Sequence, residues 1–409
     1  MKNKNINIDK NVKEDGSNKC SNFNKNLIAF VKSTCDMGVE NLIKEFQGLQ
    51  LYEKKHMKNH KAFNDNINKC RYRDVFCNDE HRFILKCESN DDNQNDFIHA
   101  NYMSSSKCSP FIATQGPLPN TINDFWKMVW QSKAYSIVMI CDIIENGKKK
   151  CEQYWPLNPL TEIKAGVIVV KFLDKQKLDK NIVKSTLLMI KREKKIRLVH
   201  HFQYFGWPDR GVPINYSPCI RLMKKATKNL PIIIHCSAGI GRTGTMICLD
   251  EILKKLNTSE ECLYVKNIIL EKRRFRYGIV QTEIQYLFIH RVLLYLAVKK
   301  KLVDNNVIAQ FVKNYDTIVT SLNCNQLKKP EQQKEKVEIK IEQIKEPPIK
   351  QILDSLDGIS NQVKDNNKLK ELLILPDTQK RNKNNSESEE SPEQKKDIKD
   401  ESGFMTLIL

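Results

Sequence analysis

The chain has 409 residues, of which 40% are hydrophobic and 29% are charged, so it is long enough for one large folded domain with tails or for two average domains. The formal net charge is +19 and its positive excess lies between residues 36 and 300, which indicates an acidic partner such as a phosphoprotein, a nucleic acid or an anionic membrane. The 13 cysteines are odd in number and scattered, without a Cys-x-x-Cys pair, which argues against a secreted disulfide framework and against a zinc site of that type.

The chain lacks the signs of membrane insertion or secretion. No apolar run approaches the length of a membrane span, and the polar start of the chain does not resemble a secretory leader. The sequence therefore predicts no transmembrane segment, and the scattered cysteines favour a cytoplasmic location.

The two ends of the chain differ in composition from its middle. Residues 1–35 are rich in Asn and Lys and are predicted to be flexible. Residues 301–409 are predicted to form a low-complexity, mostly disordered tail, with apolar spacing for one short helix at 349–375. One hypothesis is that this helix binds an unknown protein partner. The catalytic domain is expected at residues 36–300.

Hydrophobic spacing predicts helices and strands that are interspersed along this middle region. Helices are predicted at residues 37–51, 122–130 and 284–298. Strands are predicted at residues 136–140, 166–173, 185–190 and 196–204. This arrangement is typical of one α/β domain.

The most informative segment is residues 235–244, which read His-Cys-Ser-Ala-Gly-Ile-Gly-Arg-Thr-Gly. A strand-like run at 231–234 enters the segment and a helix-like run at 245–253 leaves it. A strand, a glycine-rich turn and a helix N-terminus form an anion site, because backbone N–H groups and the helix dipole converge there. Cys236 adds a nucleophile to this site, and Arg242 adds a bidentate phosphate ligand.

The same segment also contains a dinucleotide-binding pattern. The glycines within residues 239–244 form Gly-x-Gly-x-x-Gly, and Glu260 and Glu261 lie near the offset of a ribose-binding acid. A nucleotide loop needs neither the cysteine nor the arginine, however. Residues 263–270 also have the spacing of a helix and not of the required second strand, so this alternative is disfavoured.

A cysteine and an arginine separated by five residues suit the hydrolysis of a phosphate monoester. Loop N–H groups and the Arg242 guanidinium can hold the phosphate oxygens while Cys236 attacks the phosphorus in line. Thr243 is expected to donate a hydroxyl hydrogen bond to the sulfur, and His235 to orient the loop. No metal and no cofactor are expected. The residues expected to surround the phosphate are Ser237, Ala238, Gly239, Ile240 and Gly241.

A phenolate leaving group has a pKa of about 10, so its departure needs an acid. Asp209 is the candidate, because it lies in Trp207-Pro208-Asp209 between Gly206 and Gly211. Glycines at both ends of a stiff aromatic–proline centre suit a loop that moves as a body.

With these motifs in place, the chain resembles a classical cysteine-dependent protein-tyrosine phosphatase over roughly residues 37–300. The motifs follow the order of that family. They are residues 68–75 (NKCRYRDV), 96–102 (DFIHANY), 111–117 (FIATQGP), 124–130 (DFWKMVW), 145–156 (with Glu-Asn-Gly, Lys-Cys and Tyr-Trp-Pro), 206–212 (GWPDRGV), 235–244 and 280–286 (VQTEIQY).

The resemblance implies a fold and the roles of particular residues. It implies a single domain with a twisted, mixed central sheet flanked by helices on both faces. Tyr72 would form a pocket wall deep enough to select phosphotyrosine, and Asp74 would accept backbone hydrogen bonds from the substrate peptide. The remaining implied roles belong to Gln281, which would position water, Gln285, which would assist it, Glu145, which would brace Arg242, and Lys150, which would approach the acid loop.

Three departures from the family pattern are visible. Cys70 and His99 each stand where the family commonly has Asn, and Arg210 stands where Phe or His is common. They affect the expected substrate preference and not the reaction, and one hypothesis is that Arg210 favours acidic phosphopeptides. The Asn- and Lys-rich composition and the variant at 96–101 also resemble tyrosine phosphatases of parasitoid-wasp symbiotic viruses, which implies action in a host cytoplasm.

Two other functions stay open at the level of sequence. The first is a catalytically weak phosphotyrosine trap, against which the presence of Cys236, Asp209, Arg242 and Gln281 argues. The second is a phosphatase that acts on phosphoinositides or RNA 5′-phosphates, which the basic core allows. Tyr72 and the Asp209 loop argue against this second function and make a nucleic-acid partner a weak hypothesis.

Overall fold

The computed structural model describes residues 22–56, 58–86, 95–105, 110–191, 195–258 and 264–327, with side chains described as far as residue 321. All of these residues belong to one compact unit of the chain. The helix predicted at 349–375 and most of the predicted flexible N-terminal segment lie outside the described residues. In the part of the chain that the structure describes, no helix has the length and apolar character needed to cross a membrane.

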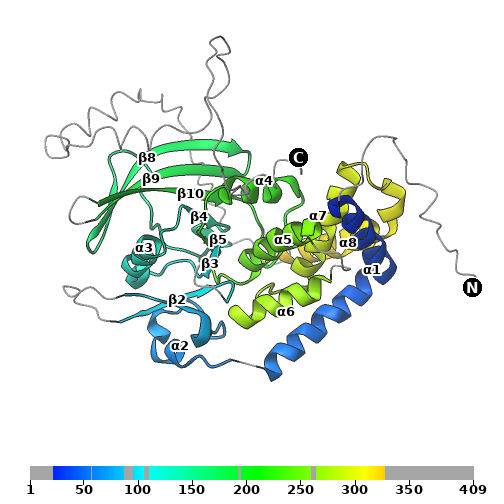
Figure 1. The fold of residues 1–409 in the computed structure, drawn as a ribbon, viewed down its shortest axis with the longest axis horizontal. Coiled ribbons are helices and arrows are strands. Elements are labelled where there is room, and N and C mark those ends of the chain that lie inside the picture. The colour runs from blue at the N-terminus through cyan, green and yellow to red at the C-terminus, as the bar shows by residue number, and fades with distance from the viewer. Residues whose placement is uncertain are drawn as a thin grey trace, which may run out of the picture. The chain divides into compact units, whose positions relative to one another are not determined.

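A mixed sheet runs through the centre of the domain (Figure 1). Within the described residues it has nine strands in the order β1-β2-β3-β11-β4-β10-β9-β8-β7, and β5 pairs separately with β6. The strands are β1 (Arg82–Ile84), β2 (Phe97–Tyr102), β3 (Phe111–Thr114), β4 (Ser136–Met139), β5 (Ile144–Glu145), β6 (Lys148–Lys149), β7 (Glu162–Ala165), β8 (Ile168–Asp179), β9 (Ile182–Lys191), β10 (Lys195–Tyr204) and β11 (Ile232–His235).

Helices lie on both sides of this sheet. Figure 1 shows α3 on one side of the central strands and α4 and α5 on the other, as the sequence resemblance implies. The helices are α1 (Asn22–Lys55), α2 (Lys61–Asp65), α3 (Ile122–Gln131), α4 (Ser217–Ala226), α5 (Gly241–Thr258), α6 (Val265–Phe275), α7 (Glu283–Lys299) and α8 (Asn305–Leu327). The helices predicted at 122–130 and 284–298 and all four predicted strands are confirmed, although β8 runs six residues further than predicted.

The register of the central strands determines where the chemistry takes place. β11 is parallel to both of its neighbours, so that His235 is paired with Thr114 of β3 and with Met139 of β4. The chain therefore leaves three adjacent strands at the same edge of the sheet. Ligands of α/β proteins typically bind at such carboxyl ends.

The N-terminal boundary of the folded unit differs from the predicted one. Helix α1 begins at Asn22 and not near residue 37, and Gly38 kinks it with a φ of 67°. The segment before the kink is helical because a stripe of apolar side chains recurs at intervals of three and four residues, a stripe that the abundant Asn and Lys obscure in the sequence. Its buried members are Phe23, Leu27, Phe30 and Val31.

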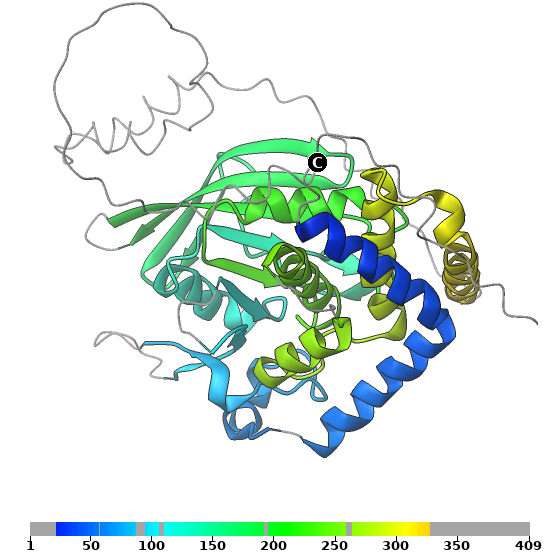
Figure 2. The same ribbon diagram turned by 45° about the vertical axis from the view of Figure 1, so that its right-hand side comes forward.

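The C-terminal boundary also differs. Helix α8 lies within the region that was predicted to be a tail, and Ile308, Phe311 and Tyr315 are buried along one of its faces. Helix α1 contacts α5, α6, α7 and α8, and Figure 2 shows it lying across the other helices. Helical structure on the α5 side of the sheet thus extends beyond residues 36–300 at both ends.

Candidate active site

The loop after β11 wraps around the thiol of Cys236. Cys236 is only 5% exposed, and the backbone N–H of Gly239 donates a 3.3 Å hydrogen bond to its Sγ. Gly239 has a φ of 71°, and a Cβ at this position would lie 1.9 Å from the carbonyl oxygen of Thr114. Only glycine therefore fits where the loop turns against β3.

Arg276, which the sequence argument did not single out, holds the outer side of this loop. Its guanidinium donates to the carbonyl oxygens of Gly239 (2.7 Å) and Ala238 (3.0 Å). In a trans peptide the C=O and the following N–H point in opposite directions. Because the two carbonyls point toward Arg276, the N–H groups of Gly239 and Ile240 point away from it, and the Gly239 N–H points toward the sulfur. Arg276 ends a run of mostly basic residues at 272–276, and it is fully buried.

Arg242, at the start of α5, is paired with Glu145. Its two terminal nitrogens donate to the two Glu145 carboxylate oxygens at 2.5 and 2.7 Å, and one of them also donates to the Ile140 carbonyl at 3.1 Å. Burial by itself would lower the pKa of Arg242, but the Glu145 hydrogen bonds and charge outweigh it and raise that pKa above the ordinary value. The structure thus brings together the two residues for which the resemblance implied a brace, and it fixes the plane of the guanidinium.

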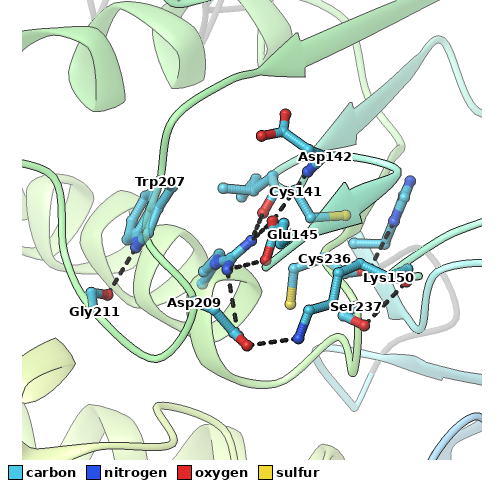
Figure 3. A network of polar contacts seen from close by, with 12 residues as sticks. Cys141, Asp142, Glu145, Lys150, Trp207, Asp209, Gly211, Cys236 and Ser237 are labelled. Atoms are coloured by element: carbon cyan, nitrogen blue, oxygen red, sulfur yellow. Dashed lines mark hydrogen bonds and ion pairs between the residues drawn. The ribbon is translucent and has the colours of Figure 1, made fainter. Parts of the chain in front are cut away.

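Asp209 lies beside this pair. Its carboxylate accepts a 2.5 Å hydrogen bond from Lys150 Nζ and lies 3.4 Å from Arg242 (Figure 3). Burial raises the pKa of Asp209, but the hydrogen bond and charge of Lys150, with the charge of Arg242, lower it overall. In the ligand-free site Asp209 is therefore held as a carboxylate.

The acid loop has an internal frame. Trp207 is buried, and its ring N–H donates to the carbonyl of Gly211 at 3.0 Å, while the Gly211 N–H donates to Pro208 at 3.1 Å. The hydroxyl of Thr282 donates to the Arg210 carbonyl at 3.5 Å, which links the acid loop to the segment that precedes α7. Asp209 is thereby carried on a braced turn and not on an open surface loop.

The two predicted glutamines lie against the start of α5. A Cβ built on Gly241 would lie 3.1 Å from Gln281 Oε1 and 2.9 Å from Gln285 Nε2. Gln285 Oε1 also accepts from the Gln281 backbone N–H at 2.9 Å. The structure thus places both side chains beside Gly241, at the phosphate loop.

Tyr72 and Asp74 come from the segment before β1. Ser237 Oγ donates to the Lys150 carbonyl at 3.0 Å, so the Tyr72 hydroxyl, 2.8 Å from Ser237 Oγ, is the donor in their shared hydrogen bond. This contact places the Tyr72 ring at the rim of the cysteine loop. Asp74 is exposed.

His235 lies at the end of β11 and orients the loop from behind. Its Nδ1–H donates to the Cys236 carbonyl at 3.0 Å, and its Nε2 accepts from the Tyr154 hydroxyl at 2.7 Å. Burial, together with the charge of Arg71, lowers the pKa of His235 to about 4, so the ring is neutral. Tyr154, which belongs to the motif at 145–156 but was given no role there, also contacts His201 at 2.8 Å.

One predicted contact is not present. Thr243 was expected to donate a hydrogen bond to the Cys236 sulfur, but its buried hydroxyl has no hydrogen-bond partner among the described residues. Thr243 lies in the first turn of α5, where its side chain is fully buried. The observed stabilisation of the sulfur comes instead from the Gly239 N–H.

The alternative dinucleotide pattern is wrong. A dinucleotide-binding unit needs a second parallel strand after the first helix, but α6 (Val265–Phe275) follows α5 in this chain. The two glutamates proposed for a ribose lie outside the described residues. The glycines serve the close turn of the cysteine loop.

Comparisons with known proteins agree with this geometry. The profile of the family described as Protein-tyrosine phosphatase matches residues 66–295. The chain is 36% identical over 271 residues to the putative receptor-type tyrosine-protein phosphatase mosPTP-1 of Culex quinquefasciatus, covering 63% of this chain and 18% of the relative. It is 37% identical to the mouse tyrosine-protein phosphatase non-receptor type 18, covering 56% of this chain and 52% of the relative. It is also 36% identical to the rat phosphatidylinositol phosphatase PTPRQ, covering 50% of this chain and 9% of the relative.

Solved structures show the same fold. The catalytic domain of human protein tyrosine phosphatase non-receptor type 18 aligns with a TM-score of 0.58 at 31% identity, covering 62% of this chain and 95% of that one. The chain thus spans about half, or less, of the length of the curated relatives but nearly all of this catalytic domain. The shared profile, relatives and fold show that the chain belongs to the protein-tyrosine phosphatase family.

Proposed function

We propose that the chain hydrolyses phosphotyrosine in proteins through a cysteinyl-phosphate intermediate. The observation that carries the proposal is the convergence of the Asp209 carboxylate and the Arg242 guanidinium, 3.4 Å apart, at the loop that encloses Cys236. The nucleophile and the phosphate ligand thus come from one segment, residues 235–244, and the acid comes to the same point from the loop after β10.

In the first step the Cys236 thiolate attacks phosphorus and the bond between phosphorus and the tyrosyl oxygen breaks. Arg242 and the loop N–H groups bind the phosphate oxygens, and Asp209 gives its proton to the leaving tyrosyl oxygen. In the free site Lys150 and Arg242 lower the pKa of Asp209 against the opposing effect of burial. A bound phosphate dianion offsets these positive charges, and this favours the protonated carboxyl that the step needs.

In the second step water attacks the cysteinyl phosphate. Asp209, now ionised, takes a proton from the water, the sulfur–phosphorus bond breaks, and inorganic phosphate leaves with the thiolate restored. We assign the positioning of this water to Gln281, with Gln285 beside it, because both lie against Gly241 at the rim of the phosphate loop.

The proposed substrates are phosphotyrosine-containing proteins, and the proposed location is the cytoplasm. The rim position of Tyr72 supports a pocket whose depth suits phosphotyrosine, since its hydroxyl bonds to Ser237 in the loop. A structure of PTPN18 in complex with HER2-pY1248 phosphopeptides, which aligns with a TM-score of 0.58 at 32% identity, supports a phosphopeptide as ligand.

A second candidate substrate is a phosphoinositide, because one relative is named a phosphatidylinositol phosphatase. Phosphate release from a phosphotyrosine peptide and from phosphatidylinositol phosphate vesicles would separate the two. We expect release from the peptide, abolished in Cys236→Ser, and a kcat lowered roughly 10²- to 10⁴-fold in Asp209→Ala, because general acids contribute factors of that size. Turnover of the lipid alone would contradict the proposal, and peptide binding without turnover would favour the trap.

A further inference from the structure

His99 lies between two loops of the active site. It is on β2, is 2% exposed, and stands where the family commonly has Asn. One ring nitrogen, Nε2, lies 2.8 Å from the carbonyl oxygen of Val75. The other, Nδ1, lies 3.1 Å from a terminal nitrogen of Arg276.

The partners determine which nitrogen of His99 carries the proton. A guanidinium can only donate, so Nδ1 accepts from Arg276, and a carbonyl can only accept, so Nε2–H donates to Val75. Burial and the charge of Arg276 lower the pKa of His99 to about 3, so the ring stays neutral across the physiological range. Both hydrogen bonds are therefore available together.

Each partner of His99 belongs to a different part of the substrate site. Val75 is the last residue of the segment 68–75, which carries Tyr72 and Asp74 and is called the recognition segment below. Arg276 holds the carbonyls of Ala238 and Gly239, which turn the loop N–H groups toward the site. One imidazole thus spans from the recognition segment to the support of the phosphate loop, and Phe63 packs edge-on against it with ring centroids 5.7 Å apart.

We infer that His99 is a positioning residue for substrate recognition, which sets the position of the recognition segment relative to the phosphate loop. It touches no substrate atom and acts through Val75 and Arg276. The inference deepens the proposed function and rests on it. Because Arg276 keeps its two carbonyl contacts without His99, loss of the imidazole should affect peptide recognition more than phosphate binding.

The test compares His99→Phe, which keeps a ring but makes neither hydrogen bond, with His99→Asn, the residue common in the family. We expect His99→Phe to raise KM for a phosphotyrosine peptide about tenfold, since displacements near 1 Å have effects of this order or larger. The inhibition constant of inorganic phosphate should change less than about twofold, because Arg276 still orients the loop. His99→Asn should recover most of the peptide KM.

His290→Phe is the matched control. His290 is also buried, on α7, where it stacks on Phe30 with centroids 5.2 Å apart and shares a 3.0 Å hydrogen bond with Thr34. This variant should lose thermal stability as His99→Phe does, but with an unchanged peptide KM. The dissociation constant of the same peptide, measured in the Cys236→Ser background with and without His99→Phe, gives the recognition effect without turnover.

Several outcomes would overturn the inference. If the wild type is active and His99→Phe has the same peptide KM, His99 has no role in recognition. The inference also fails if the phosphate inhibition constant of His99→Phe rises as much as its peptide KM. If His99→Phe does not fold, nitrogen NMR of the wild-type histidines decides, because the inference requires a neutral ring with its proton on Nε2. A wild type that turns over no phosphotyrosine peptide would instead overturn the proposed function.

Discussion

Lys150 and Asp209 form a 2.5 Å hydrogen bond across the mouth of the cysteine loop, with the lysine 9% and the aspartate 34% exposed at their side chains. Lys150 follows β6, and Asp209 lies on the acid loop after β10. The contact therefore links two segments that must move relative to one another if the acid loop opens. It also keeps Asp209 ionised before substrate binds, because Lys150 lowers the pKa of the carboxyl.

The first prediction concerns Lys150→Met. The first step needs protonated Asp209, so kcat/KM falls as the pH rises through the pKa of that carboxyl. Burial raises this pKa, and Lys150 is the leading cause that lowers it, so removal of Lys150 should raise it. The falling limb of the pH profile should therefore move to higher pH. Lys150→Arg retains the charge and should keep the wild-type limb, while an unmoved limb in Lys150→Met would show that Asp209 is not the acid.

The second prediction concerns the brace on Arg242. The side chains of Arg242 and Glu145 are 4% and 10% exposed, so Glu145→Ala leaves a buried guanidinium without its carboxylate. Removal of one partner from such a pair costs about 3–5 kcal/mol of unfolding free energy. Denaturant unfolding should show this loss, and KM should rise because the guanidinium is no longer held in plane.

Glu152→Ala is the control for that variant. Glu152 pairs with Lys149, which is half exposed, and such surface pairs contribute about 0–1 kcal/mol. Stability losses of equal size in the two variants would contradict a special role for the Glu145 pair.

The third prediction concerns Gly239→Ala. The new Cβ would clash with the Thr114 carbonyl, so the loop must shift and its N–H groups must leave their positions. Activity toward para-nitrophenyl phosphate should fall about 10²-fold or more, as loss of one preorganised donor does. Gly166→Ala separates strain from clash, since Gly166 has a φ of 60° but open space around its Cβ position. It should lose about 1 kcal/mol of stability and keep its activity.

The fourth prediction concerns helix α8. Phe311 is buried on the face that packs toward the catalytic unit, so Phe311→Ala should cost about 3–5 kcal/mol in denaturant unfolding. Lys313, which is exposed on the same helix, provides the control, because Lys313→Ala should leave the midpoint nearly unchanged. A loss below about 1 kcal/mol in Phe311→Ala would mean that the folded unit ends before α8.

The phosphate-binding half of the site could be predicted from the sequence, because its residues are close together in the chain. Cys236 and Arg242 are separated by five residues in one turn that joins a strand to a helix, so their spacing alone brings them together. Asp209 and Gln281 are distant in the chain, and their place at the site followed from the resemblance and not from spacing. The strands were predictable because β-branched runs such as residues 136–140 bury both of their faces.

Other features depend on contacts that only the folded chain makes. Nothing in the order of residues distinguishes Arg276 from its basic neighbours, because its role comes from the loop carbonyls that the fold brings to it. The two boundaries were missed for a similar reason. Helix α1 packs on α5 and α7, and helix α8 packs on α1 and α7, and these contacts join segments that are far apart in the sequence.

The distribution of thiols has a practical consequence. The structure describes eight free cysteines, of which Cys77 has a pKa raised to about 11, and Cys151 and Cys248 have a pKa raised to about 12, primarily by burial. Cys236 alone among them lies at a loop shaped to attract anions. A small negatively charged alkylating reagent such as iodoacetate should therefore label this one described position, and the stoichiometry of its uptake would count intact catalytic centres in a preparation.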